Sequence, residues 1–345
     1  MNGVDAMGRV GIKLQNGLPI SVNVALAQYA ENRGLSSVWV SETRARDAFT
    51  TMAVYAAATE RVVVGSAIVP IYTRSPVTLA MTAASLEEIA PGRIILGLGT
   101  SSSAIIEGWH GCRRHHPLLA MDEHVAAIRA ILGGERVSIA GQTLHVDGFR
   151  LEFPRLAAPT LPLYVAALGS RMLSLAGAIA DGVLLNLVPV SHIARLRKTV
   201  DAAALASGRS VDSVRLAGDL RVGTAGDPGE IQKIRERQRK YIAHYGNVDV
   251  YNRFFAEVGF SGEAEELTKA WETGDSARAL HAVSDEMLDQ MVAIGDPAAV
   301  ATRISAYLDA GLDEVILYPC WNREEDAQAA TQQAIELAAE ICEHL

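Results

Sequence analysis

The sequence predicts a (β/α)8 barrel, the TIM-barrel fold of the α/β class, with insertions. Short segments of uniformly apolar or β-branched residues alternate with helical patterns along nearly the whole chain. Segments this apolar are typical of buried parallel strands rather than half-exposed ones. Eight of them occur, whereas the competing open, doubly wound sheet usually contains fewer strands. The predicted strands span residues 10–14, 37–40, 62–67, 94–98, 163–167, 182–185, 214–222 and 314–318.

Helical patterns such as 75–89, 191–207 and 326–344 follow the strands, and two insertions interrupt the alternation. In residues 133–162, alternating residues flank two glycine-containing turns, which predicts a β-hairpin. Residues 227–296 predict a mostly helical cap without a strand of its own, lying over the barrel mouth or at a subunit contact. A length of 345 residues allows two domains, but α/β barrels often reach it as one. We therefore expect a single domain over residues 1–345.

Composition favours small-molecule chemistry in the cytoplasm. The formal net charge of -9 disfavours a nucleic-acid partner, which requires an excess of Lys and Arg. No apolar run approaches the ~20 residues that cross a bilayer, and no signal-peptide pattern opens the chain, so no membrane partner is expected. Cys112, Cys320 and Cys342 are an odd number of distant cysteines, which does not form a disulfide framework.

Residues 62–101 form one predicted strand–helix–strand unit, and parallel strands bind ligands at their carboxyl ends. The loops 67–74 and 99–103 are therefore the expected active site. Gly97 and Gly99 do not complete a dinucleotide fingerprint, because Ser102 occupies the third glycine position. The small residues instead allow a flat ring close to the backbone, with Thr100 and Ser101 as donors. A plain strand-to-loop turn is the alternative.

Residues 163–182 predict a strand, a small-residue loop and a helix that begins at Ser170. Free amides at a helix N-terminus, preceded here by Leu168 and Gly169, suit a phosphate. Gly169 and Ser170 are the first candidates for that contact. The alternative is a helix capped by Ser170 itself, without a ligand.

Glu42 lies just after the second strand, where an unpaired charge is costly. It is a candidate proton donor or ring-orienting group; the alternative is an ion pair with Arg46 or Arg74. Arg74, near the end of the loop after the third strand, is a candidate substrate contact for an anion, or a partner of a carboxylate. Arg221, at the end of the seventh strand, is a second candidate anion contact.

Residues 107–116 contain three histidines and a cysteine, but their spacing matches no zinc pattern, so no metal is expected. Trp109 is a candidate for substrate stacking. His110 is a candidate general acid because histidine titrates near neutral pH, although a surface histidine is the alternative. Trp321, after the last strand, lines the substrate pocket or closes its rim. No sequence pattern supports nucleophilic catalysis.

At these motifs the chain resembles the bacterial luciferase-like superfamily of flavin and deazaflavin oxidoreductases. The most specific part is WVSETRARDAFTTMAVYAAATERVVVGSAIVPIYTRSPVTLAMTAASLEEIAPGRIILGLGTS, which is similar to the methylenetetrahydromethanopterin reductase branch that depends on coenzyme F420. The segment ALGSRMLSLAGAIADG resembles the phosphate-binding loop of that family. The resemblance implies a luciferase-like (β/α)8 barrel and a cis peptide bond between Ala67 and Ile68 that supports the ring. It also implies ring contacts by Thr100 and Ser101, and phosphate contacts by Ala166, Ala167, Leu168 and Gly169.

Two departures limit what the resemblance implies. Sugar-phosphate-oxidising relatives carry Asp-His where this chain has Ser41-Glu42, and Gly-Glu where it has Ser101-Ser102. A sugar phosphate is therefore not the expected substrate.

The sequence leads us to expect an F420-dependent oxidoreductase that transfers a hydride between C5 of the deazaflavin and a C=N or C=C group of an organic substrate. Glu42 is the first candidate for the acid and His110 the second. One alternative is an FMN-dependent monooxygenase of the same superfamily. The other is a barrel without catalysis that acts as a binding or structural subunit. Kinship further implies a homodimer.

Overall fold

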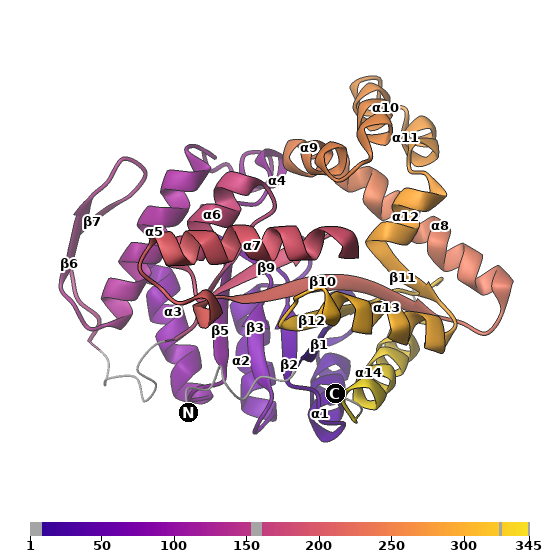
Figure 1. Ribbon diagram of the computed structural model, residues 1–345. Helices are drawn as coiled ribbons and strands as arrows, with labels where there is room; N and C mark the ends of the chain where they lie inside the picture. Colours follow the sequence, from indigo (N-terminus) through magenta and orange to yellow (C-terminus); the bar gives the residue numbers. More distant parts are fainter. Residues whose placement is uncertain (1–8, 153–160, 324–325, 344–345) are drawn as a thin grey trace.

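The computed structural model describes residues 9–152, 161–323 and 326–343. Within them, eight parallel strands close into a barrel that helices surround, which confirms the predicted fold (Figure 1). The strands follow one another around the ring in chain order, and the last pairs with the first. They are β1 (Val10–Lys13), β2 (Ser37–Val40), β3 (Val63–Ser66), β5 (Ile94–Gly99), β8 (Leu163–Ala166), β9 (Gly182–Asn186), β10 (Arg215–Thr224) and β12 (Glu314–Pro319).

Helices cover the outside of the barrel, and polar side chains begin several of them. The carboxylate or hydroxyl oxygens of Asp47, Ser75 and Asp296 each accept a hydrogen bond from a backbone N–H in the first helical turn. Such capping satisfies amides that have no partner within the helix. The helices between and after the strands are α1 (Ile20–Asn32), α2 (Ala48–Ala58), α3 (Pro76–Ile89), α4 (Ser103–Ile106), α5 (Pro117–Leu132), α6 (Ser170–Ile179), α7 (Val190–Ala206), α13 (Pro297–Asp309) and α14 (Ala327–Glu343), with a 3-10 turn at Val211–Ser213.

Apolar side chains form two separate clusters, one on each side of the strands. The larger fills the layer between the barrel and the helices. The smaller fills the barrel interior and consists of Trp39, Val63, Ile95, Tyr164, Leu184, Ala217 and Ile316. The barrel is therefore solid at its centre, so a ligand must lie at its open end, as is usual for this fold.

An antiparallel hairpin lies between α5 and β8, where the sequence predicts one. Its strands are β6 (Val137–Ala140) and β7 (His145–Phe149). Residues 153–160 of the predicted insertion lie outside the described part of the chain.

The second insertion contains the helices α8 (Pro228–Tyr245), α9 (Asp249–Glu257), α10 (Ser261–Glu272), α11 (Ser276–Ala282) and α12 (Asp285–Met291). We call these five helices the cap; they form the orange group at one end of the barrel in Figure 1. Two ion pairs, Arg235–Asp289 and Arg239–Asp285, join α8 to α12. Part of the charged face of α8 thus packs against α12.

The prediction that this insertion has no strand is wrong. β11 (Val292–Gly295) follows α12 directly and pairs in parallel with the end of β10. The reason lies in the length of β10, which pairs with β9 only as far as Asp219. Beyond that residue this edge of β10 has unpaired backbone groups, and β11 satisfies them.

No helix in the described residues has the length and apolar character to cross a membrane. The same residues contain no group of three or more His, Cys, Asp or Glu side chains arranged to hold a metal ion.

Candidate active site

A β-bulge interrupts the third barrel strand at the mouth. β3 pairs with β5 through Gly65 and Ile95, and the short strand β4 (Val69–Pro70) resumes the pairing through Val69 and Leu98. Between these two pairings the third strand advances four residues while β5 advances three, so the third strand contains one extra residue. Such a bulge redirects backbone and side chains towards a site.

The bulge contains the cis peptide bond between Ala67 and Ile68 that the resemblance implies. Neighbouring strands hold its backbone. Ala67 N–H donates to the carbonyl oxygen of Val40 over 2.7 Å, and Glu42 N–H donates to the carbonyl oxygen of Ile68 over 3.3 Å. The carbonyl oxygen of Ala67 accepts from Lys13 Nζ over 3.1 Å. Both carbonyl groups of the bulge are therefore satisfied by side chains or backbone of other strands.

Gly99 makes room for the side chain of Ile68. A Cβ atom at Gly99 would lie 2.7 Å from Ile68 Cδ1 and 2.8 Å from Ile68 Cγ1. Ala67, Ile68 and Ala166 pack on the cluster inside the barrel and are themselves only partly buried. Together they form a small apolar platform at the open end of the barrel.

The loop after β5 is held from outside by Arg114. Its Nε donates to the carbonyl oxygens of Thr100, over 3.2 Å, and Ser101, over 3.1 Å. Ser101 has a φ of 51°, which is uncommon for a residue with a side chain. Thr100 and Ser101 are half-buried at the edge of the platform. Arg114 could not be recognised from the sequence, because an isolated arginine does not indicate a contact with these carbonyls.

The N-terminus of α6 is uncapped. Gly169, with φ -75° and ψ 150°, precedes the helix, no side chain caps it, and Ser170 is its first residue. The alternative in which Ser170 caps its own helix is therefore wrong. Ser170 is exposed and lines a surface depression of about 560 Å³ between α5 and α6. Of the neighbouring residues, Ala167 already donates its N–H to the carbonyl oxygen of Leu184, so that amide is not free for a ligand.

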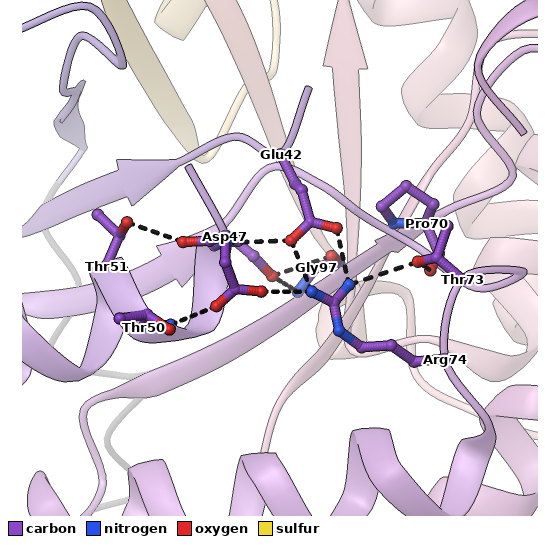
Figure 2. Close-up of polar contacts among 10 residues, drawn as sticks. Glu42, Asp47, Thr50, Thr51, Pro70, Thr73, Arg74 and Gly97 are labelled. Atoms are coloured by element: carbon purple, nitrogen blue, oxygen red, sulfur yellow. Dashed lines mark hydrogen bonds and ion pairs between the residues drawn. The ribbon is translucent and has the colours of Figure 1, made fainter. Parts of the chain in front are cut away.

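Glu42 forms the ion pair with Arg74 that the sequence left as an alternative (Figure 2). Arg74 Nη1 lies 2.7 Å from Glu42 Oε1, and Nη2 lies 2.9 Å from Oε2. Glu42 Oε2 also accepts from Ala48 N–H, at the start of α2, over 3.0 Å. Arg74 contacts Asp47 as well, whereas Arg46 binds the carbonyl oxygens of Asn16 and Leu18. Both oxygens of Glu42 thus accept strong hydrogen bonds.

His110 and Trp109 lie at the surface, in the turn after α4. Trp109 is 55% exposed and His110 is exposed. Trp321 is half-buried after β12, with the guanidinium of Arg237 5.1 Å from its ring centre. Its indole Nε1 is buried and has no hydrogen-bond partner.

Lys13 and Asp219 form an ion pair inside the mouth that the sequence analysis missed. Both side chains are nearly buried, and Asp219 Oδ1 has no hydrogen-bond partner. Burial raises the pKa of Asp219, and the ammonium group of Lys13 opposes that rise. A carboxyl group of this kind is a candidate for proton transfer.

Arg221 lies near the same end of β10. Its guanidinium carbon is 3.5 Å from the ring centre of Tyr241 and 4.3 Å from that of Tyr318. Its Nε donates to Gln238 Oε1 over 2.5 Å. The structure thus brings Arg221 into the mouth, on the side opposite the apolar platform.

The site therefore has an apolar platform, a helix N-terminus and buried ionisable groups, all at the carboxyl ends of parallel strands. In barrel enzymes the active site occupies this position. Fold and site define the protein as an α/β-barrel enzyme.

The profile of the luciferase-like monooxygenase family matches residues 2–314, and the chain belongs to this family. A 5,10-methylenetetrahydromethanopterin reductase of Methanolobus tindarius is 29% identical over 308 residues, which cover 89% of this chain and 92% of that protein.

Two solved structures share the fold. The coenzyme F420 dependent tetrahydromethanopterin reductase from Methanopyrus kandleri has a TM-score of 0.79 at 23% identity, covering 97% of this chain and 98% of that one. An F420-dependent secondary alcohol dehydrogenase, in complex with an F420-acetone adduct, has a TM-score of 0.75 at 17% identity. The match covers 96% of this chain and 99% of that one.

Proposed function

We propose that the protein is an F420-dependent oxidoreductase that transfers a hydride between the deazaflavin and a C=N or C=C group of an organic substrate. The observation that carries this proposal is the platform of Ala67, Ile68 and Ala166, a partly exposed apolar surface beside a loop of small polar residues. The reductase of Methanolobus tindarius supports it, because similarity to that protein extends over nearly the whole chain.

The residues at the mouth fit such a cofactor. Because Gly99 has no side chain, Ile68 keeps its place in the platform, where a ring can lie against it. Thr100 and Ser101, which are half-buried beside the platform, would contact the ring. The unbonded amides at Gly169 and Ser170 suit the phosphate of the cofactor's tail, with Leu168 lining its path. When bound, the deazaflavin supplies the site on C5 that accepts or donates the hydride.

For the proton that accompanies reduction we propose the Oδ1 atom of Asp219, held in place by Lys13. The carboxylate of Glu42, in contrast, accepts two bonds from Arg74 and one from Ala48 N–H. We propose that Glu42 positions the backbone of the bulge, since its own N–H binds the carbonyl oxygen of Ile68. His110 remains a second candidate acid that must approach from the exposed turn.

Arg221 and Trp321 are the proposed substrate contacts, because each has a buried N–H group without an acceptor. Trp109, exposed at the rim, is a further candidate for stacking. Arg74 is less suited to a substrate anion, because its guanidinium already lies between the carboxylates of Glu42 and Asp47.

Titration of the purified protein with F420 and, separately, with FMN tests the proposal through the change in ring fluorescence. Binding of F420 is expected. Tight binding of FMN without binding of F420 would reject the assignment and favour an FMN-dependent monooxygenase, the second candidate, which the family's description supports. If a protein that is folded by circular dichroism bound neither cofactor, a binding or structural role would be favoured instead.

We further propose a cytoplasmic homodimer without nucleic-acid or membrane partners. The formal net charge of -9 supports the absence of nucleic acid. Val54 on α2, and Met81 and Ile89 on α3, are large apolar side chains that are 38%, 48% and 46% exposed, which suits a subunit contact on these helices. Light scattering after size-exclusion chromatography measures the assembly, and a monomeric mass would contradict the dimer.

A further inference from the structure

Arg221 carries a buried positive charge without a carboxylate partner. The residue is only 8% exposed, and its Nη1 atom is buried and has no hydrogen-bond partner. Among residues 9–152, 161–323 and 326–343, Arg221 takes part in no ion pair. Buried charges are normally paired, because leaving them unpaired is costly. The charge of Arg221 therefore requires an explanation.

Neighbouring side chains fix the guanidinium and leave one of its nitrogens, Nη1, without a hydrogen-bond partner. The rings of Tyr241 and Tyr318 stack on the guanidinium, and their ring centres lie 3.5 and 4.3 Å from its central carbon. Gln238 Oε1 accepts from Nε over 2.5 Å. The two faces and Nε are thus occupied, whereas Nη1 is buried and has no hydrogen-bond partner. A donor held rigidly in this way binds an anion without losing further conformational freedom.

The surrounding groups do not supply the missing negative charge. The carboxylate of Asp219 is paired with Lys13. Burial raises the pKa values of the Tyr318 hydroxyl and the Cys320 thiol, so both groups are neutral near pH 7. With Asp219 ionised, Lys13, Asp219 and Arg221 together leave one positive charge in excess at this end of the barrel, and with Asp219 protonated for proton donation they leave two.

Arg221 also lies apart from the proposed cofactor residues. The platform and the loop that binds the tail follow β3, β5 and β8, which are neighbours in the barrel. Arg221 and Tyr318 are on β10 and β12, with Lys13 on the next strand, β1. Lys13 connects the two halves, because its Nζ is 5.4 Å from the ring centre of Tyr318 and 3.1 Å from the carbonyl oxygen of Ala67.

We propose that Arg221 binds the carboxylate group of the substrate, which is therefore an organic acid. This inference rests on the proposed function, in which the reacting part of the substrate faces the platform. A carboxylate oxygen can accept a charge-assisted hydrogen bond from the Nη1 atom of Arg221, which has no other partner. A phosphate would need several donors around its oxygens, and only the Nη1 atom of Arg221 and the Nε1 atom of Trp321 lack partners among the buried side-chain donors near α8.

Two residues of the cap contact this group. Gln238 and Tyr241 belong to α8, and the half-buried ring of Tyr241 continues into contacts with Tyr245, at 4.6 Å, and from there with Tyr251, at 4.5 Å. This row of tyrosines reaches the barrel again at Asn186, whose Nδ2 donates to Tyr251 OH over 2.8 Å. Because Nη1 is buried, an acid reaches it only when a neighbouring side chain such as that of Tyr241 moves.

Matched pairs of acid and amide test the proposal on the full-length protein loaded with oxidised F420. The probes are cinnamate with cinnamamide and benzoate with benzamide, and calorimetry measures their dissociation constants. The wild-type protein should bind at least one acid about tenfold or more tightly than its amide, which corresponds to about 1.4 kcal/mol. Arg221→Met should reduce that ratio to about one, while Arg253→Met, at an exposed position on α9, should keep it. Inorganic phosphate, as a third probe, should compete only weakly.

The proposal would be overturned if the wild-type protein bound neither acid more tightly than its amide. It would also be overturned if Arg221→Met kept the preference for the acid. Strong competition by phosphate would show that Arg221 binds a phosphate group rather than a carboxylate. Because the comparison of acid with amide uses the wild-type protein, it decides the question even if Arg221→Met does not fold. Titration with F420 precedes each measurement: a protein that binds F420 without preferring acids refutes this inference alone, whereas failure to bind F420 refutes the proposed function.

Discussion

Lys13 Nζ donates a hydrogen bond to the carbonyl oxygen of Ala67 over 3.1 Å, and the same ammonium group pairs with Asp219. One side chain on β1 thus connects the bulge in the third barrel strand to the buried carboxylate on β10. The bulge carries the proposed cofactor platform, and β10 carries the proposed substrate contact. Lys13 therefore joins the two halves of the site through one hydrogen bond and one ion pair.

Removing one member of the Lys13–Asp219 pair should be more harmful than removing both. Lys13→Met leaves a buried carboxylate without its partner, and Asp219→Leu leaves a buried ammonium group, so each should lose about 3 kcal/mol of unfolding free energy. In the double variant neither charge of the pair remains, and its loss should be smaller than the sum of the two single losses. Urea denaturation of the four proteins measures these energies.

Lys198→Met, at an exposed position of α7, is the control for exchanging a lysine for methionine. It should change the unfolding free energy by less than about 0.5 kcal/mol. Strict additivity of the Lys13 and Asp219 substitutions would show that the pair is not coupled and would remove the basis for Asp219 as a held proton donor.

Gly99→Ala should weaken F420 binding and modestly destabilise the fold. The added Cβ would meet Ile68 at 2.7 Å, and the isoleucine side chain must then move out of the platform. Overpacking of this kind costs about 1–3 kcal/mol, so the F420 dissociation constant should rise about tenfold. Fluorescence titration measures it. Gly17→Ala is the control, because nothing lies within 4 Å of a Cβ at that position; equal affinities of the two variants would exclude the platform.

Most barrel strands could be predicted from the sequence because a buried strand leaves a dense apolar signal. β11 could not, since α12 ends at Met291 and β11 begins at Val292 without a glycine or proline between them. Its pairing also depends on the free edge of β10, which the spacing along the chain does not reveal.

The site was predicted only where local sequence determines it. The loop that starts at Ala67 and the helix that starts at Ser170 follow strand ends, so position alone indicated them. The cis bond between Ala67 and Ile68 was expected only from the family resemblance, and the bulge was not predicted. Lys13 and Asp219 are 206 residues apart, and a lysine at the end of a short strand is typical of an exposed residue. Glu42 was placed correctly near the mouth, but its partner among several arginines became clear only from the structure.

Ser170→Pro should separate helix stability from phosphate binding. Proline is favoured at the first position of a helix, and the backbone of Gly169 already has the extended conformation that precedes a proline. The melting temperature should therefore stay the same or rise slightly. The lost N–H removes a hydrogen bond to a charged group, worth about 1.5–3 kcal/mol, so F420 binding should weaken at least about tenfold.

Ser170→Ala keeps the amide and removes only the hydroxyl group, and it should bind F420 nearly as well as the wild-type protein. If the alanine variant lost as much affinity as the proline variant, the contact would come from the hydroxyl group rather than from the helix N-terminus. Undiminished binding by Ser170→Pro would exclude this amide from the tail site.

Glu314 at the floor of the barrel should make stability depend on pH. The residue is fully buried; its Oε1 accepts from Trp39 Nε1 over 3.0 Å and from Ser37, whereas Oε2 has no partner. Burial raises the pKa of this carboxyl group above its ordinary value of 4.5, and the bonds from Ser37 and Trp39 oppose the rise only in part. The folded protein thus retains a proton that the unfolded chain releases.

Because the folded state binds more protons at Glu314, its contribution to the unfolding free energy falls as the pH rises from about 4.5 towards the folded-state pKa. Glu314→Gln cannot titrate, so the stability of the wild-type protein relative to this variant should decline over that range. Urea denaturation between pH 4.5 and 8 measures the difference, in which most other titrating groups cancel. Glu88→Gln, at an exposed position of α3, controls for the substitution itself. A difference that stays constant with pH would mean that Glu314 has the same pKa in the folded and unfolded states, because only a shifted pKa makes the difference depend on pH.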